Sequence, residues 1–249
     1  MKRRQIKTSS FNPPIAEAKR ISVEINKIVK SMAIDYISMP LTNDRLEQLF
    51  GKYKNVFDSK SQDWGRRVTN SAYKASTHQV DRSLKELSEK YTIGNLKLGF
   101  KEKEIFKASV QENANLFKTI PEQFHKKVAV VVFNAITHGE GAKDIASYIK
   151  KFDNGTRNYV QLRTMDQTRK AFSALSRQRM IDAGINKFQW VHTSGSEEPR
   201  KLHQELNGKV FDIDNPPYIG DMYGNRIYGF PSQLPNCKCK QKFVFADLG

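Results

Sequence analysis

The sequence predicts a mainly α protein with a small α+β carboxy-terminal module, in which an elongated helical region is followed by a compact few-stranded domain. Three observations lead to this fold class. As far as Gly184, apolar residues recur at intervals of three and four, the spacing of an amphipathic helix. Beyond Gly184 they alternate with other residues, the spacing of a half-buried strand. The 249 residues, of which 38% are hydrophobic, are enough for one large or two small domains with buried cores.

The first predicted helix begins near Pro13 and Pro14, because proline fits a first helical turn, and it ends by Pro40. Its apolar face consists of Ala18, Ile21, Ile25, Ile28, Met32 and Tyr36. Further helices are predicted as separate segments: one capped by Thr42 or Asn43 and reaching Phe57, one from Trp64 to Tyr91 that ends near Gly94, one containing Ile105 to Ile120, one from Pro121 to before Gly139, a short one around Ile145 and Ile149, and a long one through Leu162 and Leu175 to Gly184. The β-branched run 128–132 is compatible with a strand, but helical spacing continues on both sides, so we interpret it as a buried helix.

The carboxy-terminal module is predicted to contain short strands. Phe188, Trp190 and His192 form one alternating pattern, and the segments 210–211 and 243–245 are two more candidates. A loop rich in Gly, Pro, Asn and Tyr covers residues 215–236 and is too long to be structureless. We therefore divide the chain into a basic leader (1–12), an amino-terminal helical region (13–120), a middle helical region (121–185) and the carboxy-terminal α+β module (186–249).

The charge of the chain points to a polyanionic partner. Its 42 Lys and Arg against 26 Asp and Glu give a net charge of +16 and a pI near 9.7. Because no base-reading motif accompanies this surplus, we expect contacts to the phosphates of double-stranded DNA that do not depend on base sequence. An acidic protein surface is the alternative that composition leaves open. The candidate DNA contacts are Lys2, Arg3, Arg4, Lys126, Lys127, Lys150, Lys151, Arg169, Lys170, Arg177 and Arg179.

Several classes of protein are excluded at this stage. Cys237 and Cys239 are one residue apart and poorly placed to bridge each other, so a disulfide framework is not expected. We find no export signal and no apolar run near the roughly 20 residues that a membrane-spanning helix needs, so we expect no membrane partner. A host-type DNA-compacting protein would be largely disordered, whereas this chain has regular apolar periodicity.

An ordered set of residues in the last quarter of the chain carries the most specific signal. Its members are Trp190, His192, Arg200, His203, Gly208, Phe211, Pro235, Asn236, Cys237 and Cys239. In this order they resemble the carboxy-terminal signature of the phage Mu F-like head-morphogenesis, or minor head protein, family, and segments 115–121, 139–149 and 166–185 resemble that family's middle region. The chain departs from the family pattern at Lys238, where arginine is usual, and at Met165, where an Ala-Arg pair is common. Lysine keeps the charge of arginine but lacks its forked donor.

The resemblance implies a structural role rather than an enzymatic one. It implies a minor head protein at the portal vertex inside the capsid, acting in head assembly and in DNA packaging or ejection. The implied partners are the portal protein, other capsid or scaffold proteins and double-stranded DNA. The implied location is the virion, with the host cytoplasm as the site of assembly. We assign no catalytic residue and no cofactor.

The signature residues also allow two chemical alternatives. Thiolate and imidazole are ligands that zinc prefers, so His203, Cys237 and Cys239 are candidate zinc ligands, with His192 as a fourth, although zinc knuckles usually place two residues between paired cysteines. In the other alternative, a metal- or His-dependent nuclease or toxin-like enzyme would use the two histidines as general acid and base, with Glu197, Glu198 and Arg200 nearby.

We prefer an architectural interpretation of the same residues. The thiols then act as small buried side chains, while Arg200 and His203 fasten the Trp190 strand to the cysteine segment. A second polar row, formed by Asp166, Gln167 and Arg169, is interpreted in the same way, as the polar side of a helix packed in a bundle.

Overall fold

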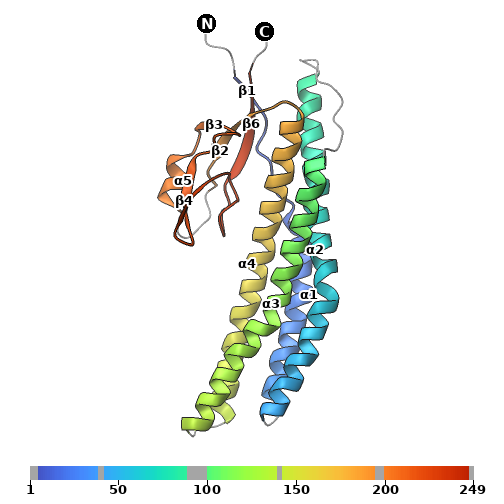
Figure 1. The fold of residues 1–249 in the computed structure, drawn as a ribbon, viewed down its shortest axis with the longest axis vertical. Helices are drawn as coiled ribbons and strands as arrows, with labels where there is room; N and C mark the ends of the chain where they lie inside the picture. Colours follow the sequence, from blue (N-terminus) through green and yellow to red (C-terminus); the bar gives the residue numbers. More distant parts are fainter. Residues whose placement is uncertain (1–4, 39–41, 89–99, 139–141, 194–198, 247–249) are drawn as a thin grey trace. The chain divides into compact units, whose positions relative to one another are not determined.

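A computed structural model describes residues 5–38, 42–88, 100–138, 142–193 and 199–246 (Figure 1). Within them the helices are α1 (Ile15–Ile37), α2 (Asn43–Ser88), α3 (Phe100–His138), α4 (Ala142–Asp182) and the short α5 (Lys201–Glu205). The strands are β1 (Gln5–Lys7), β2 (Lys187–Val191), β3 (Val210–Asp212), β4 (Tyr218–Met222), β5 (Asn225–Tyr228) and β6 (Lys240–Ala246). The predicted fold class, mainly α with a small α+β module, is confirmed.

The chain forms two compact units, each built from separate stretches of sequence. Unit 1 contains residues 1–14, 69–107 and 168–249, and unit 2 contains residues 15–68 and 108–167. Helices α2, α3 and α4 each contribute one stretch to each unit. The domain boundary predicted after Ile120 lies inside the continuous helix α3.

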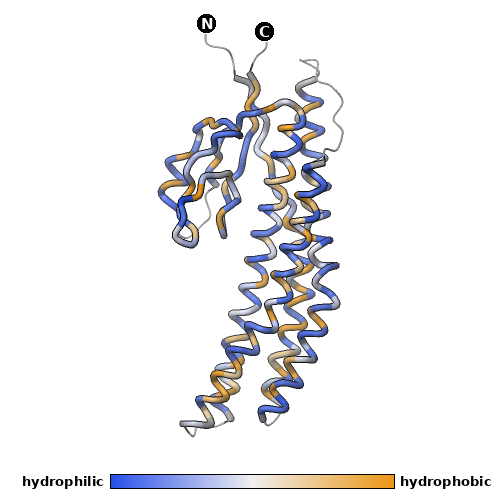
Figure 2. Tube along the Cα trace, viewed as in Figure 1, coloured by the Kyte–Doolittle hydropathy of each residue, from blue (hydrophilic) through white to orange (hydrophobic). Residues whose placement is uncertain are grey.

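Unit 2 is a helical bundle held by apolar side chains from all of its helices. Every position of the face predicted for α1 is buried except Ile28, which is partly buried against the same core. Trp64 packs edge-on against Phe57 of its own helix and Phe117 of α3. Figure 2 shows the resulting alternation of hydrophobic and hydrophilic residues along these helices. Gly65 sits where α2 and α3 approach closely, since a Cβ there would lie 2.7 Å from the Val110 carbonyl oxygen.

Unit 1 contains an antiparallel sheet in the order β1-β6-β2-β3. The alternation predicted for β2 is confirmed for Phe188 and Trp190, which are fully buried while the residues beside them in the strand are partly exposed. His192, the third residue of the predicted pattern, follows the end of the strand and is partly exposed. Strands β3 and β6 are also found where candidates were predicted. Strands β4 and β5 form a separate two-stranded hairpin, whose turn residues Tyr223 and Gly224 both have positive φ.

The main difference from the sequence prediction is that helices predicted as separate segments are continuous in the structure. The segments predicted separately at 43–57 and 64–91 belong to one helix, α2, as far as Ser88, and Thr42 caps it as expected. Likewise α3 runs through Pro121, and α4 covers the two segments predicted between Ile145 and Gly184. Residues 58–63 lack apolar spacing but contain no glycine or proline, so nothing in them ends a helix.

Three strands were not predicted: β1 within the expected leader, and β4 and β5 within the expected loop 215–236. The leader is thus part of the fold, since β1 pairs with β6 and Phe11 is buried against Phe243. No described helix is long and apolar enough to cross a membrane.

Candidate functional site

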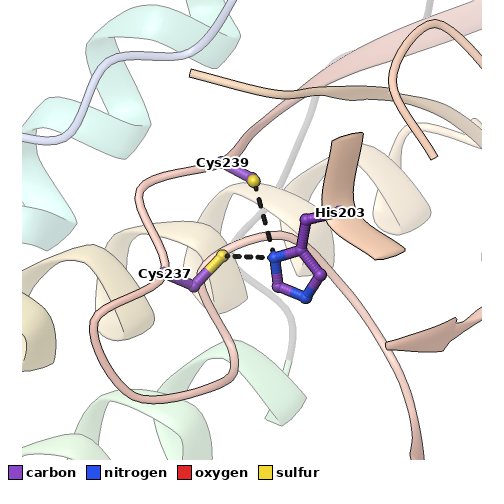
Figure 3. A group of neighbouring side chains, drawn as sticks. All are labelled: His203, Cys237 and Cys239. Atoms are coloured by element: carbon purple, nitrogen blue, oxygen red, sulfur yellow. Dashed lines mark hydrogen bonds between the residues drawn. The ribbon is translucent and has the colours of Figure 1, made fainter. Parts of the chain in front are cut away.

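The candidate site lies in unit 1, where three separate segments bring sulfur and imidazole together, and Figure 3 shows three of its residues, His203, Cys237 and Cys239. Helix α5 carries His203, the end of β2 leads to His192, and the segment before β6 carries Cys237 and Cys239. His203 and both cysteines are each 3% exposed, and the cysteines are free thiols. The structure therefore encloses this group within the core of unit 1.

One ring nitrogen of His203 faces both sulfurs. Its Nδ1 lies 3.5 Å from Cys237 Sγ and 3.7 Å from Cys239 Sγ. The ligand atoms of these three residues all lie within 4.8 Å of one another. His192 extends the group on one side, with its Nδ1 3.6 Å from Cys239 Sγ.

A hydrogen bond at the other ring nitrogen of His203 shows which nitrogen carries the proton. His203 Nε2 lies 3.0 Å from the backbone carbonyl oxygen of Ile219 in β4. A carbonyl oxygen only accepts hydrogen bonds, so Nε2 carries a proton and donates to it. In the neutral ring Nδ1 then holds a lone pair, and this lone pair points at the two sulfurs.

The two thiols titrate as a pair. The pKa of Cys237 is lowered to about 4, mainly because Cys239 donates a hydrogen bond to it, and the backbone N–H groups of Ser232 and Cys239 act in the same direction. The pKa of Cys239 is raised by that same hydrogen bond and by burial. The pair of thiols therefore loses its first proton easily, from Cys237, and keeps its second proton, on Cys239.

Trp190 supplies a further polar group at the sulfurs. Its ring packs edge-on against His203, with 5.0 Å between centroids. The indole is fully buried, and among the residues that the structure describes its Nε1 makes no hydrogen bond. It lies close enough to Cys239 to favour the charged form of that thiol, which lowers the Cys239 pKa. The effects that raise this pKa are larger.

The remaining signature residues shape the backbone around this group. Arg200 donates from Nη2 to the Pro235 carbonyl oxygen at 3.0 Å, and thus connects the start of α5 to the cysteine segment. Asn236 has a φ of 60° immediately before Cys237, and Gly208 has a φ of 79°. Phe211 of β3 packs against Phe188 of β2.

Sequence reasoning did not identify several residues that support the site. Asn207 accepts a hydrogen bond from the backbone N–H of His192 at 2.9 Å. Ser232 donates from its hydroxyl to the Cys239 carbonyl oxygen at 2.8 Å. The Ile219 contact is made by a backbone carbonyl, which every residue type carries, so no sequence signal could have indicated it. Glu197 and Glu198, named in the enzymatic alternative, lie outside the described residues.

The predicted DNA-contact residues fall into three groups. Lys126, Lys127, Lys150 and Lys151 are exposed on α3 and α4 of unit 2, and Lys126 also forms an ion pair with Glu122. Arg169, Lys170, Arg177 and Arg179 are partly buried in unit 1. Lys2, Arg3 and Arg4 lie outside the described residues.

Two of the partly buried arginines already have partners within unit 1. The Arg177 guanidinium lies over the Phe230 ring, 3.9 Å from its centroid, and Arg179 forms an ion pair with the buried Glu102. Among the predicted DNA-contact residues, the four exposed lysines are therefore more accessible than these two arginines. The polar row on α4 is mostly buried, with Asp166 1% and Gln167 8% exposed, and Gln167 donates to Glu112 of α3.

Comparison with known proteins finds similarity in the second half of the chain. Residues 126–242 match the family described as Phage Mu protein F like protein. An "Uncharacterized protein" of Haemophilus influenzae is 33% identical over 129 residues, and this alignment covers 52% of the present chain and 27% of the relative. No solved structure shows a significant match. The resemblance expected from the signature residues is thus confirmed over residues 126–242, which include every one of them.

Proposed function

We propose that this chain, whose residues 126–242 match the Phage Mu protein F like family, is a structural head-morphogenesis protein of a phage virion. The observation that carries the proposal is this match, which includes the sulfur and imidazole group of unit 1. In finer detail, we place the protein inside the capsid at the portal vertex, where it takes part in head assembly and in DNA packaging or ejection. Its partners there are the portal protein, neighbouring capsid or scaffold proteins and the genome.

The geometry of His203 supports a role without catalysis. A general acid or base must have a ring nitrogen within reach of its substrate. In His203 one nitrogen donates to the Ile219 carbonyl and the other faces two buried sulfurs. With 3% of the residue exposed, neither nitrogen is available to a nucleic acid.

A nuclease assay tests this point. Purified protein is incubated with plasmid and divalent cations beside a His203→Ala variant. We expect no cleavage by either protein. Cleavage that is lost in the variant would support the nuclease or toxin-like alternative and contradict the structural role.

A deletion in the encoding phage tests the head-morphogenesis role directly. If the protein is a virion component, mass spectrometry detects it in purified particles of the parent phage. Deletion of the gene lowers the yield of infectious particles, and a plasmid copy restores the yield. Absence of the protein from the virion, together with a normal yield of the deletion phage, would contradict the proposal.

The DNA contact is tested by salt dependence. The net charge of +16 and the exposed lysine pairs on α3 and α4 support binding through phosphates, whose affinity falls as salt rises because counterions are released. We expect fluorescence anisotropy to give the same affinity for duplexes of unrelated sequence. Each lost phosphate contact lowers the slope of log affinity against log salt by about 0.9.

A charge-matched pair of variants shows which lysines bind DNA. Lys126→Gln with Lys127→Gln removes two positive charges from α3, and Lys27→Gln with Lys30→Gln removes two exposed positive charges from α1. The α3 variant should weaken binding and flatten the salt slope more than the α1 variant. Equal effects of the two variants would point to overall charge alone, and an affinity that does not change with salt would contradict a phosphate contact.

A further inference from the structure

We propose that Cys237, Cys239 and His203 bind a zinc ion, with His192 at the fourth coordination position. This inference concerns how unit 1 is held together. It does not depend on the virion role proposed above.

The separations between ligand atoms agree with a tetrahedral zinc site. With Zn–S near 2.3 Å and Zn–N near 2.0–2.1 Å, tetrahedral angles place sulfur and nitrogen about 3.5 Å apart. The sulfur to Nδ1 distances are 3.5 Å and 3.7 Å for His203, and 3.6 Å between Cys239 and His192. His203, Cys237 and Cys239, whose ligand atoms all lie within 4.8 Å of one another, can therefore share one metal ion, and His192 adjoins this group at Cys239.

The orientation of His203 is that of a metal ligand. Metal-binding histidines usually donate their second ring N–H to a carbonyl or carboxylate, which fixes the tautomer and directs the free lone pair at the metal. In His203 the Ile219 carbonyl takes this role at 3.0 Å, and Nδ1 faces the sulfurs. Its hydrogen bond to β4 would keep the ring in place when the metal leaves.

Hydrogen-bond donors lie around both sulfurs. Backbone N–H groups of Ser232 and Cys239 point at Cys237 Sγ, and the Thr193 backbone N–H points at Cys239 Sγ. Within the described part of the chain the fully buried indole N–H of Trp190 makes no hydrogen bond, and a charged Cys239 sulfur would provide an acceptor for it. Two thiolates in an apolar core require a compensating cation, and a zinc ion supplies two positive charges.

The type and position of the ligands select zinc over other ions. Two thiolates and imidazole in a tetrahedral set suit Zn²⁺, whereas Mg²⁺ and Ca²⁺ prefer oxygen ligands. The three buried ligands form the core of the site. His192 is partly exposed, and its Nδ1 lies 3.6 Å from Cys239 Sγ, so it completes the coordination from the solvent side.

Metal analysis of the full chain tests the site. The protein is purified without a histidine tag and under reducing conditions, and its metal content is measured by inductively coupled plasma mass spectrometry. We expect about one zinc per chain, as for a structural zinc site. The double variant Cys237→Ser with Cys239→Ser should lose this zinc, whereas Lys238→Ala, which changes only the exposed residue between the cysteines, should retain it.

Cobalt substitution keeps the test informative if the cysteine variant does not fold. Wild-type protein is stripped with a chelator and titrated with Co²⁺, whose visible absorption reports tetrahedral coordination by thiolate. We expect one equivalent to give that spectrum and zinc to abolish it. The His192→Ala variant should bind cobalt at least tenfold more weakly but should still bind one ion. This result would distinguish the fourth ligand from the three buried ones.

Three outcomes would overturn the proposal. The first is wild-type protein that contains no zinc and takes up neither zinc nor cobalt while its thiols are free. The second is a Cys237–Cys239 disulfide in protein isolated without reductant, detected by mass spectrometry of peptides. The third is zinc that remains at one equivalent in the folded double cysteine variant.

Discussion

Glu102 of α3 is 1% exposed and forms an ion pair with Arg179 of α4, whose guanidinium also lies 5.0 Å from the centroid of the Tyr73 ring. Burial raises the pKa of the Glu102 carboxyl, and the positive charge of Arg179 opposes that rise. Removal of one partner leaves the other as an isolated charge in the core of unit 1. We therefore expect Glu102→Ala to lower the free energy of unfolding by about 3–5 kcal/mol in a urea titration.

The double variant Glu102→Leu with Arg179→Met is the matched control for that prediction. It removes both charges and fills the space with apolar groups, so it should recover most of the lost stability. A Glu102→Ala protein as stable as wild type would show that the pair does not hold the helices together.

His125 of α3 connects acidity to the stability of unit 2. Its Nδ1 lies 3.0 Å from the Tyr36 hydroxyl, and its ring stacks on Phe50 at 4.6 Å between centroids. Burial lowers the pKa of His125, and Glu47 acts in the opposite direction. The unfolded chain therefore binds a proton more readily than the folded protein does between the lowered pKa and about 6.5.

The expected result is a loss of stability as the pH falls from about 6.5 through the lowered pKa of His125. Urea titrations from pH 7.5 to pH 5 should show this loss in the wild-type protein and a smaller one in His125→Gln. Tyr36→Phe retains the histidine and should keep the pH dependence. Identical pH profiles for wild type and His125→Gln would contradict the assignment.

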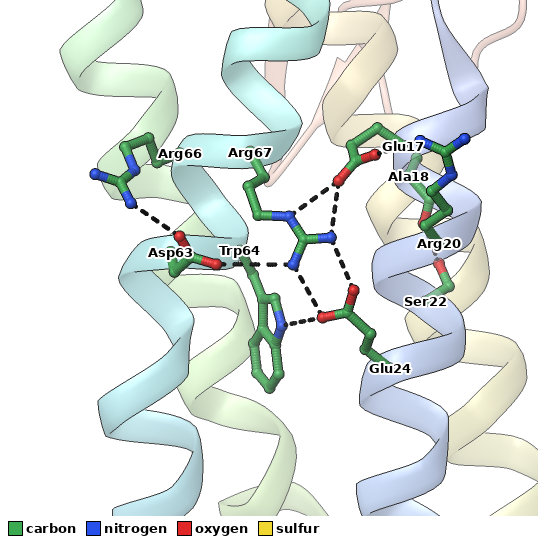
Figure 4. Close-up of polar contacts among 9 residues, drawn as sticks. All are labelled: Glu17, Ala18, Arg20, Ser22, Glu24, Asp63, Trp64, Arg66 and Arg67. Carbon is green, nitrogen blue, oxygen red and sulfur yellow. Dashed lines mark hydrogen bonds and ion pairs between the residues drawn. The ribbon is translucent and has the colours of Figure 1, made fainter.

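At the scale of elements, α1 and α2 are joined by a network around Arg67 (Figure 4). The guanidinium donates to Glu17 at 2.8 Å and to Glu24 at 2.7 Å, and the Trp64 indole N–H also donates to Glu24 at 3.1 Å. The Arg67 hydrogen bonds are the main cause of the lowered pKa of Glu24. The network therefore favours folding above the ordinary pKa of a glutamate, and this contribution is lost as the pH falls through the lowered value.

Arg67→Lys tests the forked geometry of this network. Lysine keeps the charge but cannot reach both carboxylates with paired donors. Because the Glu24 side chain is 44% exposed and water screens the interaction, we expect a loss of about 1 kcal/mol in the free energy of unfolding rather than the effect of a buried pair. A double-mutant cycle with Glu24→Gln should show that the two losses are not additive.

Two glycines of α2 have opposite surroundings. A Cβ on Gly65 would meet the Val110 carbonyl oxygen at 2.7 Å and the Ala114 nitrogen at 3.0 Å, both of them backbone atoms of α3. Nothing lies within 4 Å of a Cβ on Gly51. We expect Gly65→Ala to lower the free energy of unfolding by about 1–3 kcal/mol. Gly51→Ala should raise it by about 0.5–1 kcal/mol, because alanine favours the helix.

The same elements show what the sequence could predict. The apolar face of α1 is visible because most of its buried positions carry aliphatic or aromatic side chains at intervals of three and four residues. The continuity of α2 and α3 is not visible, because residues 58–63 have no apolar spacing and Pro121 resembles a helix start. The β4–β5 turn uses Tyr223 before Gly224 in place of the asparagine or aspartate that usually indicates such a hairpin.

At the scale of the whole molecule, the candidate site was predictable as a set of residues but not as a geometry. The order of Trp190, Arg200, His203 and the cysteines identified the family signature. The direction of His203 Nδ1 depends on a backbone carbonyl of β4, in a segment interpreted from the sequence as a loop. The placement of the Ile219 carbonyl beside His203 follows from the packing of segments that are separate in the sequence. Such packing leaves no local sequence pattern.

The division into two units predicts separate responses to metal removal. If zinc holds the cysteine segment to α5, chelation should speed amide hydrogen exchange in β2 and β6 of unit 1. Residues 21–36 of α1, which lie in the separate core of unit 2, should keep their protection. Hydrogen exchange followed by mass spectrometry measures both regions at once, and equal changes in both would contradict the prediction.

Strand β6 lies between β1 and β2 in the sheet, although it follows both of them along the chain. The ribosome therefore releases β1 and β2 long before the strand that joins them has been made. Until residues 240–246 emerge, β1 has no partner in this sheet and one edge of β2 stays open. Translation of β6 thus decides when the sheet can close, and a nascent chain that stalls before it would present unpaired strands to chaperones and proteases.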